Sequence, residues 1–288
     1  MEIPTKFVDK AKFVRAIFTD VEREYDVLLH LMTLSFDWVW RRRMFAKMDF
    51  SGEVMVLDLA CGTGLVTFEM SHAIRDGGLI VGLDLSPAML SIANRKKHMF
   101  QGECKVDFVR AVGEYLPFRD ATFRYVTIGL ALRNFADKLA MFRDSLRVLI
   151  HSGWFLSVDF VRPEGVTVWR FYNFHVFHVL PTIGGLVSSH WKRTLIYLAN
   201  TILKASTAKE TSGALLDAGF QRTFSEKMTL GVVALVCGQA RTARDSYFAT
   251  TGTAGAAKVS CVTMQATASF VDPTRIAFFA ASTALLLT

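Results

Sequence analysis

A glycine-rich segment flanked by acidic residues is the part of this sequence best suited to bind a small molecule. The segment Asp58-Leu59-Ala60-Cys61-Gly62-Thr63-Gly64 follows a short apolar run and precedes residues with helical spacing. Gly62 and Gly64 would let the backbone approach a ligand closely, and the start of the helix offers free N–H groups. Asp84 follows the next apolar run, about 20 residues after the first glycine, where a carboxylate can accept hydrogen bonds from both ribose hydroxyls.

The residues around this segment indicate which ligand it would take. Thr67 stands where the dinucleotide fingerprint G-x-G-x-x-G has its third glycine, which argues against a pyrophosphate. Asp58 would repel a phosphate but suits a cationic amino-acid group. Glycine turns also occur without ligands, and Asp84 could instead cap the helix that begins at Ser86-Pro87. Together and in this order, the residues favour a ligand with a ribose and a positive charge but no phosphate, which describes S-adenosylmethionine.

The elements that must position these residues follow from the alternation of apolar runs and helical spacing. The expected strands are 54–59, 79–84, 106–110, 125–128, 154–159 (after a turn at His151-Ser152-Gly153), 221–227 and 230–237. The expected helices among them are 65–75, 86–98, 138–149 and 209–218. This order predicts an α/β fold with a doubly wound, mostly parallel, seven-stranded sheet, and the last two strands, joined by a tight turn, predict an antiparallel edge.

The ends of the chain and one internal segment depart from this alternation. Apolar residues recur at helical spacing from Phe7 to Val21, so we expect an N-terminal helical cap over residues 1–50. The α/β domain then covers 51–239 and contains an aromatic-rich, helical insertion at about 166–205, a candidate lid. Residues 240–288 are rich in Ala, Thr, Ser and Gly and are expected to form a poorly ordered tail with a short apolar end.

Composition limits the classes of partner. Hydrophobic residues make up 51% of the chain, the mean hydropathy is +0.30 and the formal net charge is +7, which excludes disorder over the whole length and leaves anionic partners open. The apolar run 276–287 is too short to cross a bilayer, for which about 20 residues are needed. Four scattered cysteines without a C-x-x-C pair argue against disulfides and a zinc site, so no metal is expected: Cys61, Cys104, Cys237 and Cys261.

Two sets of motifs resemble a known family. The glycine segment, Gly82 to Leu90, and Glu114-Tyr115-Leu116-Pro117-Phe118 resemble the successive motifs of Rossmann-like S-adenosylmethionine-dependent methyltransferases. A second set resembles, more narrowly, the UbiE/COQ5/MenG family of quinone C-methyltransferases, and the two sets cover roughly Phe13 to Gly238 in order. The second set comprises Tyr25-Asp26, Trp40-Arg41-Arg42, Ala131-Leu132-Arg133-Asn134, Phe177-His178-Val179-Leu180-Pro181, Tyr197-Leu198-Ala199 and Leu216-Asp217-Ala218-Gly219-Phe220.

The resemblance implies C-methylation of a prenylated quinol, of the demethylmenaquinol or ubiquinol-precursor type, with S-adenosylmethionine as the cofactor. Tyr25 would close over the cofactor from the N-terminal region, although ordinary packing explains it equally well. The full set of residues expected around the cofactor is Tyr25, Asp58, Gly62, Gly64, Thr67, Asp84, Leu85, Val112, Gly113 and Gly129.

Methyl transfer to a quinol carbon requires a base and a group that stabilises the phenolate oxygen. Arg133 and Asn134 follow the fourth strand and would face the substrate, with Arg133 as stabiliser because its pKa is too high for a base. Arg133 could instead pair with Asp159 near the next strand end. His178 is the candidate base or substrate partner, since its ordinary pKa suits proton transfer.

Several alternatives stay open. The chain could methylate another lipophilic or phenolic molecule, or it could be a non-catalytic subunit of a quinone-biosynthesis complex, which Leu29, Val112 and Gly129 favour as departures from the family pattern. The expected partners are a lipophilic quinol and, on its basic and apolar surface, a membrane; nucleic acid is not expected. We expect a location on the cytoplasmic or organelle-matrix side, peripheral to the membrane, and leave open a homodimer.

Overall fold

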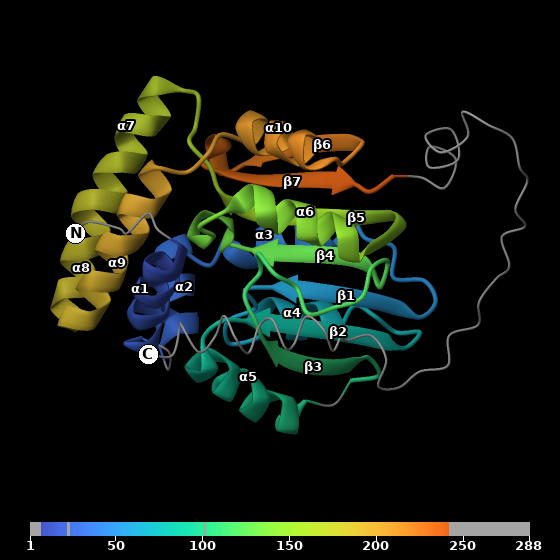
Figure 1. Ribbon diagram of the computed structural model, residues 1–288. Coiled ribbons are helices and arrows are strands. Elements are labelled where there is room, and N and C mark those ends of the chain that lie inside the picture. Colours follow the sequence, from blue (N-terminus) through green and yellow to red (C-terminus); the bar gives the residue numbers. More distant parts are fainter. Residues whose placement is uncertain (1–6, 22–23, 101, 242–288) are drawn as a thin grey trace, which may run out of the picture.

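The computed structural model describes residues 7–21, 24–100 and 102–241. Seven strands form one twisted sheet in the order β3-β2-β1-β4-β5-β7-β6 (Figure 1). Their bounds are β1 (Val54–Leu59), β2 (Gly78–Asp84), β3 (Lys105–Arg110), β4 (Phe123–Gly129), β5 (Leu149–Phe160), β6 (Arg222–Met228) and β7 (Val233–Gln239). The predicted doubly wound, seven-stranded sheet is confirmed. All neighbouring pairs from β3 to β5 are parallel, and β7 is antiparallel to both β5 and β6.

The strand order reverses beside β1, whose two neighbours are β2 and β4. In such sheets the chain leaves the two central strands toward opposite faces, which opens a crevice at their carboxyl ends. Buried side chains alternate between the two faces of β1, so that Val56 packs into one hydrophobic core and Leu57 into the other. The sequence pattern of an apolar run therefore becomes a strand covered on both sides.

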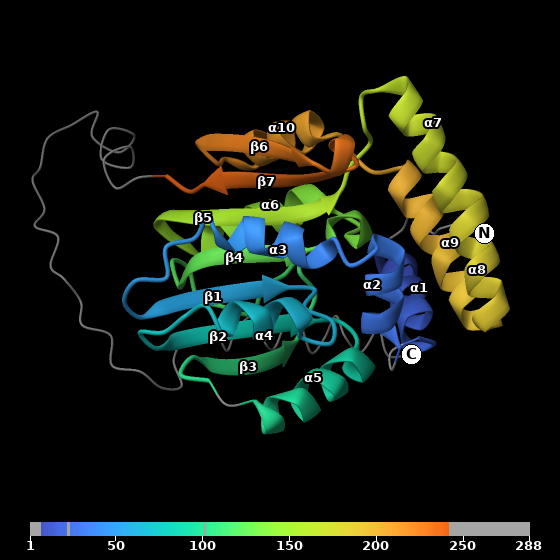
Figure 2. The same ribbon diagram turned by 180° about the vertical axis from the view of Figure 1, so that it is seen from behind.

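Helices cover both faces of the sheet. On one face lie α3 (Asp37–Phe45) and α4 (Leu65–Ser71), and on the other lie α6 (Lys138–Val148) and α10 (Ala208–Ala218) (Figures 1 and 2). The helix α5 (Pro87–Met99) flanks β3. Each boundary has a local cause: Ser86 and Asp137 cap α5 and α6 through their side chains, and Gly219 ends α10 in the left-handed conformation.

Three predicted boundaries are wrong. The helix expected to reach residue 75 ends at Ser71, because tight turns follow through residues 72 and 73. The turn expected at His151-Ser152-Gly153 lies inside β5, where Ser152 takes a positive φ of 63° and its amide still donates a hydrogen bond to Arg241, just beyond the end of β7. The last strand begins at Val233 rather than residue 230, because a single helical turn over Thr229–Gly231 forms the connection.

The predicted helical cap and helical insertion are confirmed, and the first two cap helices together with the insertion cover the carboxyl edge of the parallel strands (Figures 1 and 2). The cap comprises α1 (Phe7–Thr19), α2 (Tyr25–Thr33) and α3. The insertion comprises α7 (Val166–Phe174), a π-helical turn (His175–Val179), α8 (Leu180–Val187) and α9 (Ser189–Leu203), with α8 packed along α9 and α9 against α1. Both therefore lie over the edge where the glycine segment ends.

The predicted tail lies outside the described residues beyond Arg241. At its expected start, the Ala240 amide donates to Gly153 and the Ser152 amide donates to Arg241, so these two residues still pair with β5. Within the described ranges, no helix has both the length and the apolar character that crossing a bilayer requires.

Candidate cofactor site

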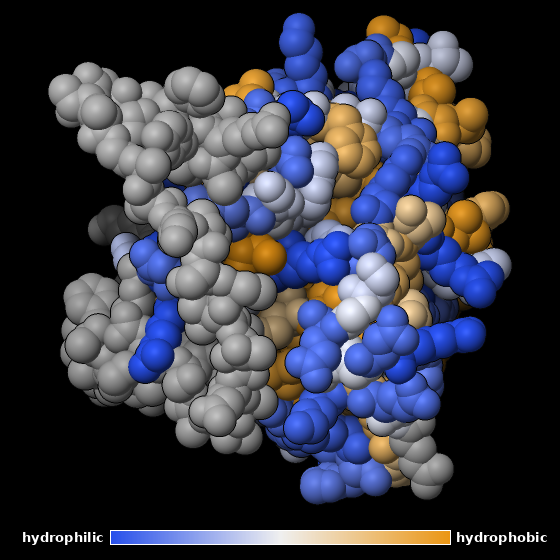
Figure 3. Space-filling model, turned by 90° about the vertical axis from the view of Figure 1, so that its right-hand side faces the viewer, coloured by the Kyte–Doolittle hydropathy of each residue, from blue (hydrophilic) through white to orange (hydrophobic). Residues whose placement is uncertain are grey.

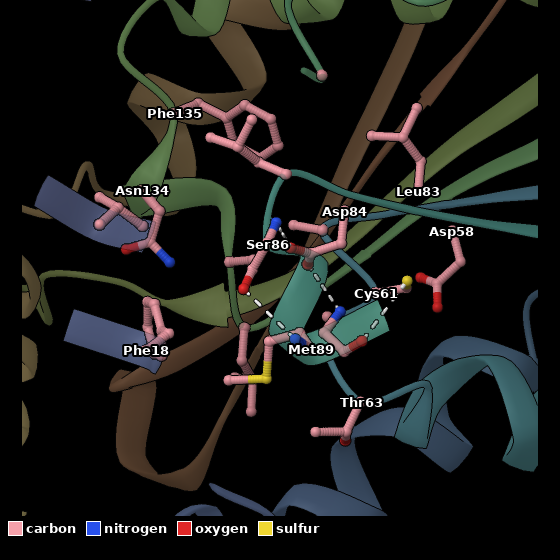
Figure 4. A pocket seen from close by; sticks show the side chains of 18 of the residues that line it. Phe18, Asp58, Cys61, Thr63, Leu83, Asp84, Ser86, Met89, Asn134 and Phe135 are labelled. Atoms are coloured by element: carbon pink, nitrogen blue, oxygen red, sulfur yellow. Dashed lines mark hydrogen bonds between the residues drawn. The ribbon is translucent and has the colours of Figure 1, made fainter. Parts of the chain in front are cut away.

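A deep cavity opens at the carboxyl ends of β1, β2 and β4, at the point where the strand order reverses. It encloses about 1230 Å³ including its mouth, and the cap helices α1 and α2 form its roof. Asp58 and Asp84 line it from the strand ends, whereas Asn134 and Phe18 lie on the other side of the close-up from Asp58 (Figure 4). This is the position in which open α/β sheets bind ligands.

The Asp84 carboxylate holds the glycine segment in place. Its two oxygens accept hydrogen bonds from the Gly62 amide and the Ser86 amide, each at 2.8 Å (Figure 4). The cap of α5 is a different side chain, because the Ser86 hydroxyl accepts from the Met89 amide. Burial raises the pKa of Asp84, opposed by these two amides and by that of Leu85. A carboxylate has about four lone-pair sites in all, so Asp84 can still accept a hydrogen bond from a molecule in the cavity.

Asp58 is a buried carboxylate to which the described part of the chain brings no cation. Its oxygens accept hydrogen bonds from the Thr67 hydroxyl at 2.6 Å and the Thr127 hydroxyl at 3.0 Å. Burial, together with a smaller effect of nearby Asp84, raises its pKa to about 6 despite these two donors. Thr67 does not itself line the cavity; it is buried and contacts Asp58 through the hydrogen bond described above. A positive group in the cavity would favour the ionised form of this carboxylate.

The two glycines of the segment serve different purposes. Gly62 has a φ of +56°, and a Cβ on it would meet no atom within 4 Å, so its backbone borders open space in the cavity. Gly64 is the N-cap of α4 with a φ of +81°, and a Cβ there would lie 2.7 Å from the Phe68 ring. Both glycines thus take a left-handed backbone conformation that favours glycine; at Gly64 the Phe68 ring also leaves no room for a Cβ, whereas at Gly62 the space beside the backbone is open.

The cap helix α2 is fastened to the glycine segment. Asp26 accepts a hydrogen bond from the Thr63 hydroxyl and forms an ion pair with Lys96 of α5, both at 2.6 Å. The neighbouring Tyr25 lines the cavity, and burial raises the pKa of its hydroxyl to about 12. The hydroxyl therefore remains protonated near neutral pH and can donate a hydrogen bond.

Four more of the residues expected around the cofactor also line the cavity: Leu85, Val112, Gly113 and Gly129. Two of these positions need a glycine for packing. A Cβ on Gly113 would lie 2.3 Å from the Phe135 ring, and one on Gly129 would lie 2.7 Å from Val66. Because these two positions have no Cβ, the side chains of Phe135 and Val66 can pack directly against the backbone at the cavity wall.

Asn134 lines the cavity from the helical turn after β4 (Leu132–Asn134). Its Oδ1 accepts a hydrogen bond of 2.9 Å from the hydroxyl of Tyr197, which lies on α9. Burial raises the pKa of Tyr197 to about 12, so this hydroxyl remains a donor. With Oδ1 engaged in this way, the Nδ2 group of Asn134 keeps its two N–H donors for a ligand.

Arg133 does not line this cavity. Its Nη1 forms a buried ion pair of 2.7 Å with Asp159, and Asp159 also accepts from the Arg133 amide. A further hydrogen bond runs from Nη1 to the Leu130 carbonyl, and the guanidinium lies over the Phe160 ring. The alternative that the sequence left open, pairing with Asp159, is the arrangement that the structure adopts, and it ties down the turn that carries Asn134.

His178 lies away from the cavity. It is exposed on the π-helical turn of the insertion, where its ring packs against Phe174 with centroids 5.4 Å apart. Among the cavity-lining residues that the structure describes there is no histidine, and nowhere in the described ranges do three His, Cys, Asp or Glu side chains gather as they would around a metal ion.

Other residues at the cavity were not predicted as site residues. Glu114 lines it and accepts from the Ala136 amide at 3.0 Å, and burial raises its pKa. Arg41 also lines it and binds Glu69 of α4 through two hydrogen bonds, Nε at 2.6 Å and Nη2 at 2.8 Å. Phe18 belongs to the apolar stripe of α1 and lines the cavity. That stripe was the one feature of the sequence which indicated that the cap packs over another part of the protein.

Comparisons with known proteins agree with this geometry. The model of the "ubiE/COQ5 methyltransferase family" matches residues 6–240. Proteins named ubiquinone/menaquinone biosynthesis C-methyltransferase UbiE are similar: that of Pseudoalteromonas translucida is 34% identical over 79% of this chain and 90% of its own length. That of Marinomonas sp. is 33% identical, over 81% of this chain and 92% of its own.

Solved structures share the fold. A SAM-dependent methyltransferase of Thermotoga maritima superposes with a TM-score of 0.57 at 15% identity, covering 78% of this chain and 99% of its own. Since the family model spans most of the chain, and the relatives are more than 30% identical over nearly four-fifths of it, this protein is a member of the ubiE/COQ5 methyltransferase family.

Proposed function

We propose that this protein transfers a methyl group from S-adenosylmethionine to a ring carbon of a prenylated quinol in ubiquinone or menaquinone biosynthesis. The observation that carries the proposal is the placement of Asp58, Gly62 and Asp84 around one cavity at the reversal point of the sheet. The names of the relatives support the reaction class, since they describe C-methyltransferases of this pathway.

The residues of the cavity fit the cofactor in three respects. Asp58 offers its buried carboxylate to the positively charged amino-acid portion. Asp84 offers spare lone pairs to the ribose hydroxyls, and Gly62 leaves open space next to the backbone. Leu85 and Val112 provide apolar contacts for the adenine ring. When bound, S-adenosylmethionine supplies a methyl group that is electrophilic because it is attached to a sulfonium.

The chain's own contribution to the reaction is to orient the quinol and to stabilise its phenolate. Loss of a proton from a quinol hydroxyl to solvent places negative charge on the oxygen and on the ring carbon beside it. That carbon takes the methyl group and then releases its own hydrogen as a proton. The Nδ2 group of Asn134 can donate a hydrogen bond to that oxygen, because Tyr197 holds the Oδ1 side of the amide. The Tyr25 hydroxyl is a second donor at the cavity wall. Donors that are fixed in advance stabilise such charge more than water does.

Arg133 acts in this proposal as a positioning residue. Its ion pair with Asp159 fixes the turn on which Asn134 lies, and its positive charge lowers the pKa of the Tyr25 and Tyr197 hydroxyls. His178 is assigned no part in the proton transfer, since it lies outside the cavity. The cap helices α1 and α2 exclude water from the reaction, and the Asp26 contacts hold them on the glycine segment.

A prenylated quinol is dissolved in lipid, so the protein must meet it at a membrane surface. We therefore place the protein in peripheral contact with a membrane while it works.

The cofactor part of the proposal is tested by calorimetry with S-adenosylmethionine on wild type, Asp84→Ala and a matched control, Asp107→Ala. The control removes an exposed carboxylate on the neighbouring strand β3, outside the cavity. We expect Asp84→Ala to weaken binding at least about tenfold, since it removes the ribose acceptor and two hydrogen bonds that shape the loop. An unchanged dissociation constant for Asp84→Ala would exclude the ribose assignment.

A further inference from the structure

The outer helix of the insertion exposes several large apolar side chains. From Val166 to Val187 the chain runs through α7, the π-helical turn and α8 without a break. Phe171 is 75% exposed, Phe174 60% and Leu186 84%, and Ile183 and Val187 are also exposed. Single exposed apolar residues are ordinary, but five on one continuous helix form a surface that favours contact with something apolar. We refer to these five side chains as the α7–α8 face.

The fold itself does not need the α7–α8 face. The opposite side of the same helix supplies the buried contacts, through Val176, Leu180 and Gly184. A Cβ on Gly184 would lie 2.5 Å from Leu195 of α9, so the two helices already pack closely there. The exposed side chains are therefore additional to those that hold the insertion on the protein.

The insertion itself carries basic but no acidic side chains. No acidic residue occurs between Glu164 and Glu210, whereas Arg170, Lys192, Arg193, Lys204 and Lys209 lie within that stretch. Arg193 is neutralised by Asp20 beside α1. Arg170 and Lys192 are both exposed and have no ion-pair partner among the described residues.

Lys192 lies directly beside the face. A Cβ on Gly185 would lie 3.3 Å from the Lys192 Cδ atom, so the lysine side chain lies against α8 at Gly185, the residue before Leu186. Arg170 is adjacent to Phe171 on α7. These two cations thus flank apolar side chains. Basic residues beside apolar ones are typical of helices that lie in the interfacial plane of an anionic membrane.

The other end of the molecule differs. Figure 3 looks at the amino ends of the parallel strands, on the side away from α7 and α8. There, hydrophilic residues predominate among the coloured atoms, and hydrophobic areas are smaller and scattered. The insertion and the cavity, in contrast, share the carboxyl side of the sheet (Figure 1).

We propose that the α7–α8 face is the membrane-docking surface of this protein, with Phe171, Phe174 and Leu186 inserted among lipids and Arg170 and Lys192 on anionic headgroups. The inference rests on the proposed function only in that a lipid-dissolved substrate requires a docking surface. It would place the mouth of the cavity and the lipid surface on the same side of the molecule.

Co-sedimentation with vesicles tests the proposal. The full-length protein is mixed with phosphatidylcholine vesicles that contain about one-third phosphatidylglycerol, and with vesicles of phosphatidylcholine alone. We expect binding to the anionic vesicles. Arg170→Glu with Lys192→Glu should reduce the partition coefficient at least about 25-fold, since each basic residue at such a surface contributes about fivefold. Phe171→Ser with Phe174→Ser and Leu186→Ser should reduce it at least about tenfold on the same vesicles.

Matched controls replace similar residues elsewhere. Arg95→Glu on α5 and Leu216→Ser on α10 change an exposed cation and an exposed apolar residue that lie outside the insertion. Both controls should sediment with anionic vesicles as the wild type does. Equal binding by the face variants and the wild type would overturn the proposal, as would a loss of binding that the controls share.

Two further readouts distinguish membrane docking from self-association and from damage to the fold. Sedimentation equilibrium without lipid should give the same mass for the wild type and the face variants; a wild-type dimer that the face variants break would overturn the proposal in favour of a second copy of this chain. Calorimetry with S-adenosylmethionine and methylation of a short-tailed, water-soluble quinol should be unchanged in the face variants. Failure of the wild type in those two assays would contradict the proposed function without affecting the result on vesicles.

Discussion

The carboxylate of Asp26, on cap helix α2, accepts a 2.6 Å hydrogen bond from the hydroxyl of Thr63 in the glycine segment. These two residues are 37 positions apart, and the contact joins a cap helix that covers the cavity to the glycine segment that lines it. The same carboxylate pairs with Lys96, so three separate elements meet at one side chain. Closure of the cap over the cavity therefore depends on a small polar junction.

Replacing Asp26 should loosen this junction. We predict that Asp26→Asn raises the dissociation constant for S-adenosylmethionine about fivefold, a modest effect because the ion pair is partly exposed to water. Isothermal calorimetry measures it, with Asp9→Asn on α1 as the control, since that exposed residue lies outside the cavity. In a double-mutant cycle with Asp26→Ala, which removes the acceptor, Thr63→Val should add little to the effect of Asp26→Ala. Fully additive effects would show that the hydrogen bond does not couple the two sites.

The raised pKa of Asp58 predicts how cofactor binding depends on pH. Its pKa is about 6 in the protein without cofactor, and a cationic ligand requires the ionised form. Affinity should therefore be constant above pH 6 and fall about tenfold for each pH unit below it, because binding releases one proton. Calorimetry from about pH 4.5 to 8 in buffers of different ionisation enthalpy measures both quantities. A flat profile would contradict the pairing of Asp58 with the positive charge.

The same carboxylate should lower the stability of the protein at neutral pH. A pKa of about 6 in the folded state lies above the unfolded value of about 3.9, so the folded state holds the proton more tightly. This advantage is complete below about pH 4 and is lost as the pH rises through 6, a change of about 3 kcal/mol. The change in the free energy of unfolding caused by Asp58→Asn, measured by urea unfolding without cofactor, should therefore be more stabilising at pH 8 than at pH 4. An equal effect at both pH values would argue against the shift.

The buried pair of Arg133 and Asp159 should stabilise the fold only as a pair. Arg133→Met leaves an unpaired buried carboxylate, and we predict a loss of about 3–5 kcal/mol in the free energy of unfolding. Adding Asp159→Asn should recover most of that loss, since no buried charge then remains at this pair. Urea unfolding of the two single variants and the double variant gives the coupling. If the double variant were as unstable as Arg133→Met, the ion pair would not be the cause.

Tyr197 should affect turnover without affecting cofactor binding. Tyr197→Phe removes the 2.9 Å hydrogen bond that orients the Asn134 amide, so we predict about a tenfold lower kcat with an unchanged dissociation constant for S-adenosylmethionine. Asn134→Ala should lower kcat about 100-fold, because it removes the donor to the phenolate. The matched control is Tyr115→Phe, which changes an exposed tyrosine outside the cavity. A parallel loss of cofactor binding would indicate a general structural role for Tyr197.

The sequence was informative where local pattern decides the structure. The apolar runs of β1 and β2 are buried on both faces, and their length and bounding residues identify them as strands without any knowledge of their partners. Gly62 and Asp84 could be predicted at the cavity because Asp84 ends one such strand and Gly62 lies in the turn that follows the other. Carboxyl ends of neighbouring parallel strands must meet at one edge, so their proximity follows from the topology.

Side-chain direction within helices and turns could not be read in the same way. The π-helical turn changes the register of the insertion, and His178, which the ordinary helical period could not place, lies on the exposed side. Arg133 and Asn134 are adjacent in one helical turn, yet only Asn134 lines the cavity, because Asp159 draws the arginine away. The contact between Asp26 and Lys96 joins residues 70 positions apart, for which the sequence carries no signal.

The most direct test of the account is a methyl-transfer assay with the purified protein. It is incubated with S-adenosylmethionine that carries an isotopically labelled methyl group, and with demethylmenaquinol or a ubiquinol precursor kept reduced in lipid vesicles. Mass spectrometry and NMR of the extracted lipid then locate the label. We predict one labelled methyl group on a ring carbon of the quinol and none with Asp84→Ala. Label on a quinol oxygen, or no transfer to either quinol by a protein that binds the cofactor, would contradict the proposed reaction.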